Sequence, residues 1–237
     1  MSKYILPILL VLLTSRCTRD PKSPPLFQLL RKDATGLDFE NRLQQSSAFN
    51  VFNYMYFFNG GGVAAGDFNN DGRIDLYFSS NMGPNKMFLN EGNLKFKDIT
   101  EQAGVSGCSP DGNCGWKTGI SVIDLNNDGM LDLYVGQLGE YQNMRGKNQL
   151  FICQKIENGI PVYAEKAAEY GLDLVGFATQ AVFFDYDLDG DLDLYQMNHS
   201  LHQNGTFAER KRFEGQYHPL AGDRLLRNDQ GRFTDVT

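Results

Sequence analysis

Three copies of one eleven-residue motif constrain the fold of this chain more than any other feature of its 237 residues. The copies begin at Asp67, Asp124 and Asp185, so successive copies are 57 and 61 residues apart. Each has Asp at positions 1, 5 and 9, Asn or Asp at position 3, Gly at position 6, and Leu-Tyr at the end. A second shared block follows each copy, at residues 87–90, 149–152 and 225–228. The repeating unit is therefore a supersecondary element and not an isolated loop.

The residues around each motif predict strands. Short runs of small or apolar residues precede the motifs at 63–66, 120–123 and 181–184. After the first motif, two sets of residues alternate as in a half-buried strand. These sets are Ile74, Leu76 and Phe78 on one face, and Asp75, Tyr77 and Ser79 on the other. Further apolar runs bring each unit to about four strands, and a short helix is expected only within Tyr163–Tyr170.

The predicted fold is all-β, with four-stranded blades of the β-propeller type. About three blades are expected in residues 37–237, at about 60–105, 115–172 and 176–237. Closed propellers usually need four to eight blades, so the expectation is an incomplete propeller. The last residue, Thr237, falls inside the repeating pattern. We therefore expect a piece of a longer repeat protein, whose further blades would be partners of this chain, although a short natural protein is the alternative.

The motif spacing matches a calcium-binding loop, because alternating positions of a tight loop point their oxygen atoms inward and Ca²⁺ takes six to eight oxygen ligands. Side chains at positions 1, 3, 5 and 9 and the carbonyl at position 7 are the expected donors, and Gly at position 6 permits the turn. In the third loop the side chain at position 7 is an additional donor. The candidate ligands are Asp67, Asn69, Asp71, Arg73, Asp75, Asp124, Asn126, Asp128, Met130, Asp132, Asp185, Asp187, Asp189, Asp191 and Asp193.

About three structural Ca²⁺ ions are predicted. The loops are not EF-hands, because position 12 holds Phe78, Val135 or Gln196 where a bidentate Glu is required. The alternative is a set of Asp- and Asn-rich turns that need no ion. Repulsion among the clustered carboxylates favours the calcium interpretation. No nucleophile or general base accompanies the loops, so the sequence predicts no enzyme.

The motifs resemble the FG-GAP/VCBS repeats of integrin α-chain propellers and of bacterial surface proteins. Residues 58–68, 84–90, 96–105 and 116–119 are most similar to the VCBS-repeat lipoproteins of Bacteroidetes-type bacteria, whose longer members carry an ASPIC/UnbV domain. The resemblance covers about residues 36–237. It implies a calcium-binding propeller of the seven-bladed type, at the cell surface or outside the cell, acting in adhesion or ligand capture. This chain shows about three blades and no ASPIC/UnbV segment.

The N-terminus resembles a bacterial lipoprotein signal. Lys3 precedes an apolar run of about ten residues, which suits a signal peptide better than a membrane span. We expect a signal peptide at 1–16, lipidation of Cys17 and a proline-containing tether at 17–36. The alternative is an ordinary secretory signal. Both place the protein outside the cytoplasm: in the outer membrane or at the cell surface through a lipid anchor, or else periplasmic or secreted.

Four further features carry weaker indications. Cys108 and Cys114 flank a turn-rich segment, so an oxidising compartment would permit a disulfide between them. Cys153 lies in an apolar run and is expected to be a buried thiol. His199 and His202 are interpreted as polar surface residues of a long insertion, with a transition-metal pair as the alternative. The single tryptophan, Trp116, is expected to pack between sheets, with sugar stacking as the alternative.

The charge balance bears on the choice of partner. A net charge of −7 argues against sequence-independent nucleic-acid binding, which needs a basic face. The predicted function is therefore a calcium-stabilised binding module with an unidentified protein or glycan ligand, acting in surface adhesion or protein interaction. The alternative is an accessory polysaccharide-binding component, or a non-catalytic part of a larger surface enzyme.

Overall fold

The computed structural model describes residues 25–142, 144–200, 211, 214–215 and 217–237. The chain divides into two units, Met1–Arg31 and Lys32–Thr237. The structure describes only residues 25–31 of the first unit, so the predicted signal peptide and Cys17 lie outside the described part. The second unit contains helix α1 (Lys32–Thr35), which falls inside the predicted tether. No helix in the described residues is long and apolar enough to span a membrane.

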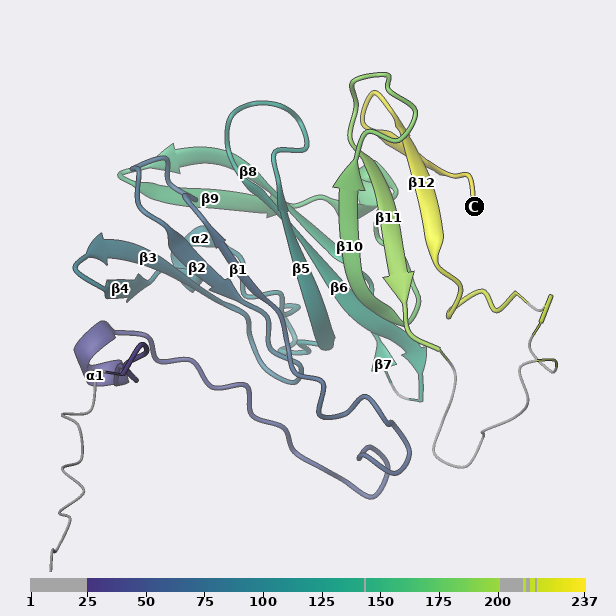
Figure 1. The fold of residues 1–237 in the computed structure, drawn as a ribbon, viewed down its shortest axis with the longest axis horizontal. Helices are drawn as coiled ribbons and strands as arrows, with labels where there is room; N and C mark the ends of the chain where they lie inside the picture. The colour runs from purple at the N-terminus through teal and green to yellow at the C-terminus, as the bar shows by residue number, and fades with distance from the viewer. Residues whose placement is uncertain (1–24, 143, 201–210, 212–213, 216) are drawn as a thin grey trace, which may run out of the picture. The chain divides into compact units, whose positions relative to one another are not determined.

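Three antiparallel sheets follow one another along the second unit (Figure 1). Two of them have four strands. The middle sheet has four strands in the same order and a short fifth, β7, paired with β6. The strands of the first sheet are β1 (Val63–Gly66), β2 (Asp75–Phe78), β3 (Lys86–Gly92) and β4 (Lys95–Asp98). Those of the second are β5 (Trp116–Ile123), β6 (Asp132–Tyr141), β7 (Met144–Arg145), β8 (Gln149–Glu157) and β9 (Ile160–Glu165). Those of the third are β10 (Ala178–Phe184), β11 (Asp193–Asn198), β12 (Arg224–Asp229) and β13 (Arg232–Asp235).

The prediction of an all-β fold with incomplete, propeller-like blades is confirmed. Every sheet runs from an innermost to an outermost strand in chain order, and the innermost strands β1, β5 and β10 pack side by side. Helix α3 (Ala167–Tyr170) lies within the predicted helical segment, but residues 163–165 belong to strand β9. The expectation of a single helix is wrong, because helix α2 (Thr100–Ala103) occupies the corresponding place after the first sheet.

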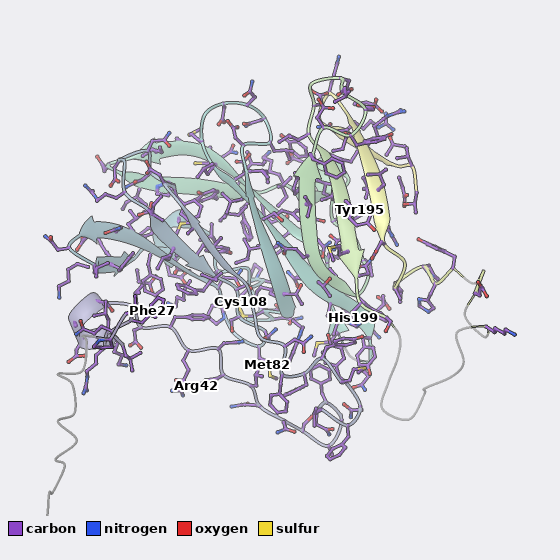
Figure 2. All side chains as sticks on the ribbon, viewed as in Figure 1. Phe27, Arg42, Met82, Cys108, Tyr195 and His199 are labelled. Atoms are coloured by element: carbon purple, nitrogen blue, oxygen red, sulfur yellow. A yellow bond between two sulfur atoms is a disulfide. The ribbon has the colours of Figure 1, made fainter. Side chains whose placement is uncertain are left out.

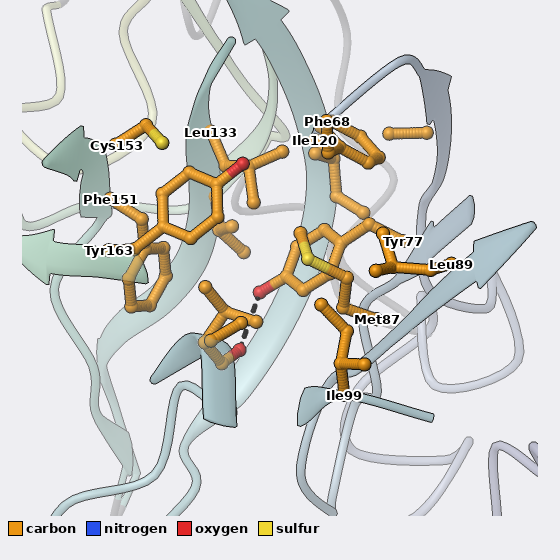
Figure 3. Packing of buried hydrophobic residues seen from close by; sticks show 14 residues of the cluster. Phe68, Tyr77, Met87, Leu89, Ile99, Ile120, Leu133, Phe151, Cys153 and Tyr163 are labelled. Carbon is orange, nitrogen blue, oxygen red and sulfur yellow. Dashed lines mark hydrogen bonds between the residues drawn. The ribbon is translucent and has the colours of Figure 1, made fainter. Parts of the chain in front are cut away.

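The first two sheets pack through a shared apolar core. Tyr77 of β2 is fully buried in it, and its hydroxyl donates to the carbonyl of Val105 (2.8 Å; Figure 3). The same hydroxyl accepts from the Asn85 amide (2.7 Å). The second sheet contributes Leu133 and Phe151 to the same core. Because both hydrogen bonds of the hydroxyl are made inside the core, this large aromatic side chain fills the space between the sheets without leaving a polar atom unpaired.

The second and third sheets repeat this arrangement. Tyr134 is also fully buried; its hydroxyl donates to the carbonyl of Leu172 (3.1 Å) and accepts from Asn148 (2.9 Å). The matching residue of the third sheet, Tyr195, is 36% exposed and donates to Asp223 (3.0 Å). The difference arises because no described residue packs a further sheet onto this face, which also exposes Val182 and Met197.

The apolar residues around strand β2 suggest that the face of Ile74, Leu76 and Phe78 is buried. The structure buries the opposite face. Ile74 is 56% exposed, whereas Asp75 and Tyr77 are fully buried. The face with Asp75 and Tyr77 meets the second sheet, and the opposite face has no neighbouring sheet among the described residues. Phe39 of the preceding segment partly covers that opposite face by stacking on Phe78, with ring centroids 4.9 Å apart.

An aromatic cluster forms where the segment before the first sheet meets the starts of the inner strands. Trp116 is buried there against Phe49 and Tyr54, at centroid distances of 4.9 and 5.7 Å. Trp116 therefore packs against this preceding segment, in a core of its own, and not only between sheets. His199 stacks on Phe177 in the same cluster, with centroids 5.0 Å apart.

The interpretation of His199 as a polar surface residue is wrong. Its side chain is only 8% exposed, and its Nε2 lies 3.1 Å from the Tyr54 hydroxyl. Figure 2 shows the residue at the end of strand β11, beside the aromatic side chains. The sequence placed His199 at the start of a polar insertion, which hid its packing. His202 lies outside the described residues.

Acidification is expected to destabilise the fold through His199. Burial lowers the pKa of His199, so between that pKa and about 6.5 the unfolded chain binds the proton more readily. The free energy of unfolding should therefore fall with decreasing pH through this window, by at most about 1.4 kcal/mol per pH unit. Urea unfolding of the wild type and of His199→Phe between pH 7 and pH 5 measures the effect. Equal pH slopes for the two proteins would contradict it.

Candidate metal centre

The three predicted metal loops connect the two innermost strands of each sheet. They join β1 to β2, β5 to β6 and β10 to β11, and Figure 1 shows them at the same ends of the blades. In every loop, positions 4 and 6 have positive φ. Position 6 is Gly72, Gly129 or Gly190, as the motif requires. Position 4 is Asn70, Asn127 or Leu188, with φ between 55° and 64°. Position 4 is not among the positions that the motif spacing predicts, although Asn in two of the loops is a signal for it, because Asn tolerates this conformation.

The first carboxylate of each loop fixes the turn. Asp67 accepts hydrogen bonds from the backbone N–H groups of Asp71 (2.9 Å) and Gly72 (2.7 Å). Asp124 and Asp185 make the same pair of bonds in their own loops, at 2.9–3.0 Å and 3.1–3.2 Å. A carboxylate has about four acceptor positions, so two such bonds leave it able to bind a cation as well.

The ninth position of each loop is a buried carboxylate that joins three parts of its sheet. Asp75, Asp132 and Asp193 have no exposed surface. Each accepts one backbone N–H from loop position 2 and one from the third strand of the sheet. The donors are Phe68 and Asn90, Leu125 and Cys153, and Tyr186 and Asn228, all at 2.7–3.0 Å. The sequence identified these residues as ligands but not as anchors for the third strand.

Burial shifts the titration of two of these carboxyl groups. It raises the pKa of Asp132 to about 6, against the lowering effect of the two backbone N–H bonds. It also raises the pKa of Asp75. The other loop acids, Asp124 and Asp128 around Asp132, add to the upward shift. A nearby divalent cation would oppose both effects, since it favours the ionised form.

Position 3 distinguishes the third loop from the other two. Asn69 donates to Asp71 (3.0 Å), and Asn126 donates to Asp128 (2.9 Å). Asp187 has no amide hydrogen to donate. In the third loop, Asp185, Asp187 and Asp193 each offer an oxygen, and these oxygens lie within 4.8 Å of one another. Partial desolvation and the carboxylates of Asp189 and Asp193 raise the pKa of Asp187. Within the described residues, the other loops do not bring three acidic side chains this close.

One buried oxygen tests whether a cation fits the first loop. The Asn69 amide donates to Asp71 and to the carbonyl of Gly159 (3.0 Å), which fixes the orientation of the carboxamide. Its Oδ1 atom is buried and has no hydrogen-bond partner in the described structure. Leaving such an atom unpaired costs about 1–3 kcal/mol. Because position 3 is a predicted ligand, a bound cation would satisfy this oxygen, and the residues present fit Ca²⁺.

The side chains at position 7 hold the outer hairpin of each sheet. Arg73 donates through Nε to the carbonyl of Asn90 (2.7 Å), and Asp191 accepts from the backbone N–H of Gln230 (2.9 Å). Met130 Sδ lies 3.8 Å from Cys153 Sγ. The Asp191 side chain, predicted as an additional ligand, is therefore already hydrogen-bonded to the turn between β12 and β13. The position-7 carbonyls remain candidate ligands.

The described cysteines form one disulfide and one free thiol. Cys108 and Cys114 are joined by a disulfide, before strand β5. Cys153 is a buried free thiol in strand β8, as its apolar context predicts. Burial raises the pKa of this thiol to about 11, so it is protonated and unreactive at neutral pH.

Replacement of Leu188 by Asn is expected to stabilise the protein. Leu188 has φ 64°, a left-handed backbone conformation that is unfavourable for leucine. Its side chain is 86% exposed, so no packing offsets this cost. Asn at this position should raise the free energy of unfolding by about 0.5–1 kcal/mol. The reverse change, Asn127→Leu, should lower it by a similar amount. Chemical denaturation in chelator measures both variants, and effects of the same sign would disprove the explanation.

Comparison with known proteins agrees with the repeated loops. Residues 67–135, which include the first two loops, match the family model described as FG-GAP-like repeat. Cartilage acidic protein 1 from Mus musculus and from Homo sapiens are each 32% identical over 138 residues, covering 57% of this chain and 20% of the relative. The Xenopus tropicalis protein of the same name is 27% identical over 139 residues. The chain thus spans about a fifth of the length of these curated relatives. Residues 67–135 are therefore similar to FG-GAP-like repeats, and the third loop repeats the same geometry outside the matched residues.

Proposed function

We propose that this chain is a calcium-stabilised binding module that is exported from the cytoplasm and acts by interaction and not by catalysis. The observation that carries the proposal is the occurrence of the same loop three times. In the third loop the carboxylates of Asp185, Asp187 and Asp193 lie close together. The match to FG-GAP-like repeats supports a propeller-like binding module outside the cell. Surface adhesion and protein interaction are the roles we propose for it.

Calcium suits these loops because their donors are hard oxygen atoms in a flexible, turn-based arrangement. The ninth-position carboxylate also holds the third strand, so an ion bound to it would tie the loop to the sheet. Loop carboxylates such as Asp67 are held by backbone N–H groups and are not positioned against a nucleophile. This arrangement supports a structural role for the ion. We therefore propose about three structural ions.

The N-terminal sequence and the disulfide support export. Lys3, the apolar run and Cys17 fit a lipoprotein signal, and the Cys108–Cys114 bond suits an oxidising compartment. We propose that Cys17 anchors the protein at the outer membrane or cell surface. The exposed face around Tyr195 supports a further proposal, that another blade of a longer protein packs there.

Calcium is expected to raise the thermal stability of the chain. At a hundred times its dissociation constant, one bound ion adds about 2.7 kcal/mol, which corresponds to several degrees for a domain of this size. Thermal unfolding in millimolar Ca²⁺ and then in chelator measures the shift. A midpoint that is the same in both conditions would show that the loops are simple turns.

The variant Asp187→Asn should shift stability in opposite directions in the two conditions. Without calcium it relieves repulsion among Asp185, Asp187 and Asp193, so the midpoint should rise. With calcium it weakens a ligand, so the gain from the ion should shrink. Glu91→Gln removes one charge from an exposed position of strand β3 and serves as the matched control. If both variants responded alike, the triad would not be a metal centre.

Lipid anchoring is tested by replacing Cys17. The wild-type chain expressed with its N-terminus should sediment with membranes, and Cys17→Ser should appear in the soluble exported fraction, because a single residue carries the acyl groups. Mass spectrometry of the N-terminal peptide identifies the modification. An unmodified N-terminus after cleavage at another position would favour the ordinary secretory signal.

A further inference from the structure

A hollow of about 240 Å³ lies where the innermost strands β5 and β10 begin, close to the aromatic cluster. Tyr54, Tyr56, Trp116 and His199 line it; Tyr56 is half-buried and the other three are buried. The metal loops follow the other ends of the same strands. Strand β5 has eight residues, so it separates the two regions by about 25 Å. The hollow is therefore distinct from the metal centre.

Glycine backbone forms part of the wall. Gly60 and Gly61 line the hollow, and a Cβ atom placed on Gly60 would meet no atom within 4 Å. Gly61 approaches the carbonyl of Ser79 too closely to accept a side chain. The peptide groups are consequently accessible beside the rings, which is a common feature of sites that bind small polar molecules.

Polar groups accompany the rings. The hydroxyl of Thr118 donates to the carbonyl of Ala178 (2.9 Å), and that of Thr179 donates to the carbonyl of Met197 (3.1 Å). Their lone pairs remain available as acceptors. Asn59 is exposed at the edge, and its carboxamide has no hydrogen bond within the described part of the chain. It can both donate and accept.

The hollow disfavours ions. None of its described lining residues carries an acidic side chain, a lysine or an arginine. Burial lowers the pKa of His199, which keeps the ring neutral at pH 7. A charged ligand would lose its hydration without gaining an opposite charge. A purely apolar ligand is also disfavoured, because it would displace water from the acceptor lone pairs of the Thr118 and Thr179 hydroxyls and offer no donor in return.

We propose that this hollow binds one neutral pyranose ring of a glycan. A pyranose presents a C–H face to aromatic rings and hydroxyl groups to acceptors and amides, which matches the two kinds of wall. The volume suits a single ring. The inference rests on the proposed binding function and names a ligand class for it. The metal loops do not line this hollow.

Fluorescence of Trp116, the only tryptophan of the chain, reports directly on this site. The probes are the methyl glycosides of glucose, galactose, mannose and N-acetylglucosamine, titrated into the full chain in calcium up to about 50 mM. At least one should give a saturable change with a dissociation constant on the order of 1 mM. Asn59→Ala and Tyr56→Ala should weaken that binding about tenfold, while Phe52→Ala, an exposed aromatic of the same segment, should leave it unchanged.

Asn59→Ala keeps the test valid if Tyr56→Ala fails to fold, because the Asn59 side chain makes no hydrogen bond in the described structure. The absence of a saturable signal for all four glycosides would overturn the sugar proposal. So would binding that Asn59→Ala leaves unchanged. If calcium still raises the unfolding midpoint in either case, the proposed calcium-stabilised module stands and only the ligand class is wrong.

Discussion

The buried carboxylate at the end of each metal loop is the interaction on which the rest of the structure depends. Asp75, Asp132 and Asp193 each bind one backbone N–H in the loop and one in the third strand of their sheet. A carboxylate without exposed surface is costly unless it is hydrogen-bonded or paired with a cation. The same residue therefore specifies the sheet and favours an ion beside it. This coupling explains why the loop and the blade repeat together.

Packing between blades depends on a second repeated device. Tyr77 and Tyr134 place their rings between sheets while an Asn and a carbonyl satisfy each hydroxyl. In the third blade, Tyr195 meets Asp223 in place of an Asn and remains partly exposed. Side chains that bond across inner strands add to the interface: Ser121 donates to the carbonyl of Ala181, and Gln180 donates to that of Ile120. Blade-to-blade order thus rests on polar as well as apolar contacts.

The two ends of the inner strands have different chemistry. The loop end concentrates carboxylates and suits a divalent cation. The other end holds aromatic rings, glycine backbone and neutral polar groups, and its aromatic segment precedes the first blade in the sequence. In the function proposed above, this division would keep the structural ions and the ligand apart, so that one set of contacts would maintain the blades and the other would recognise a partner.

The sequence by itself determined the repeat, the strand-rich blades and the loop positions, because each depends on local spacing: Asp and Gly at fixed intervals dictate a turn wherever they occur. The buried thiol of Cys153 was also readable from its apolar neighbours. Tertiary structure alone decided which face of each strand is buried, because that depends on a blade about sixty residues away; hence Ile74 is exposed and Asp75 is not. It also decided the burial of His199, which packs on Tyr54, 145 residues earlier in the chain. Local patterns carry no information about partners that are so distant in sequence.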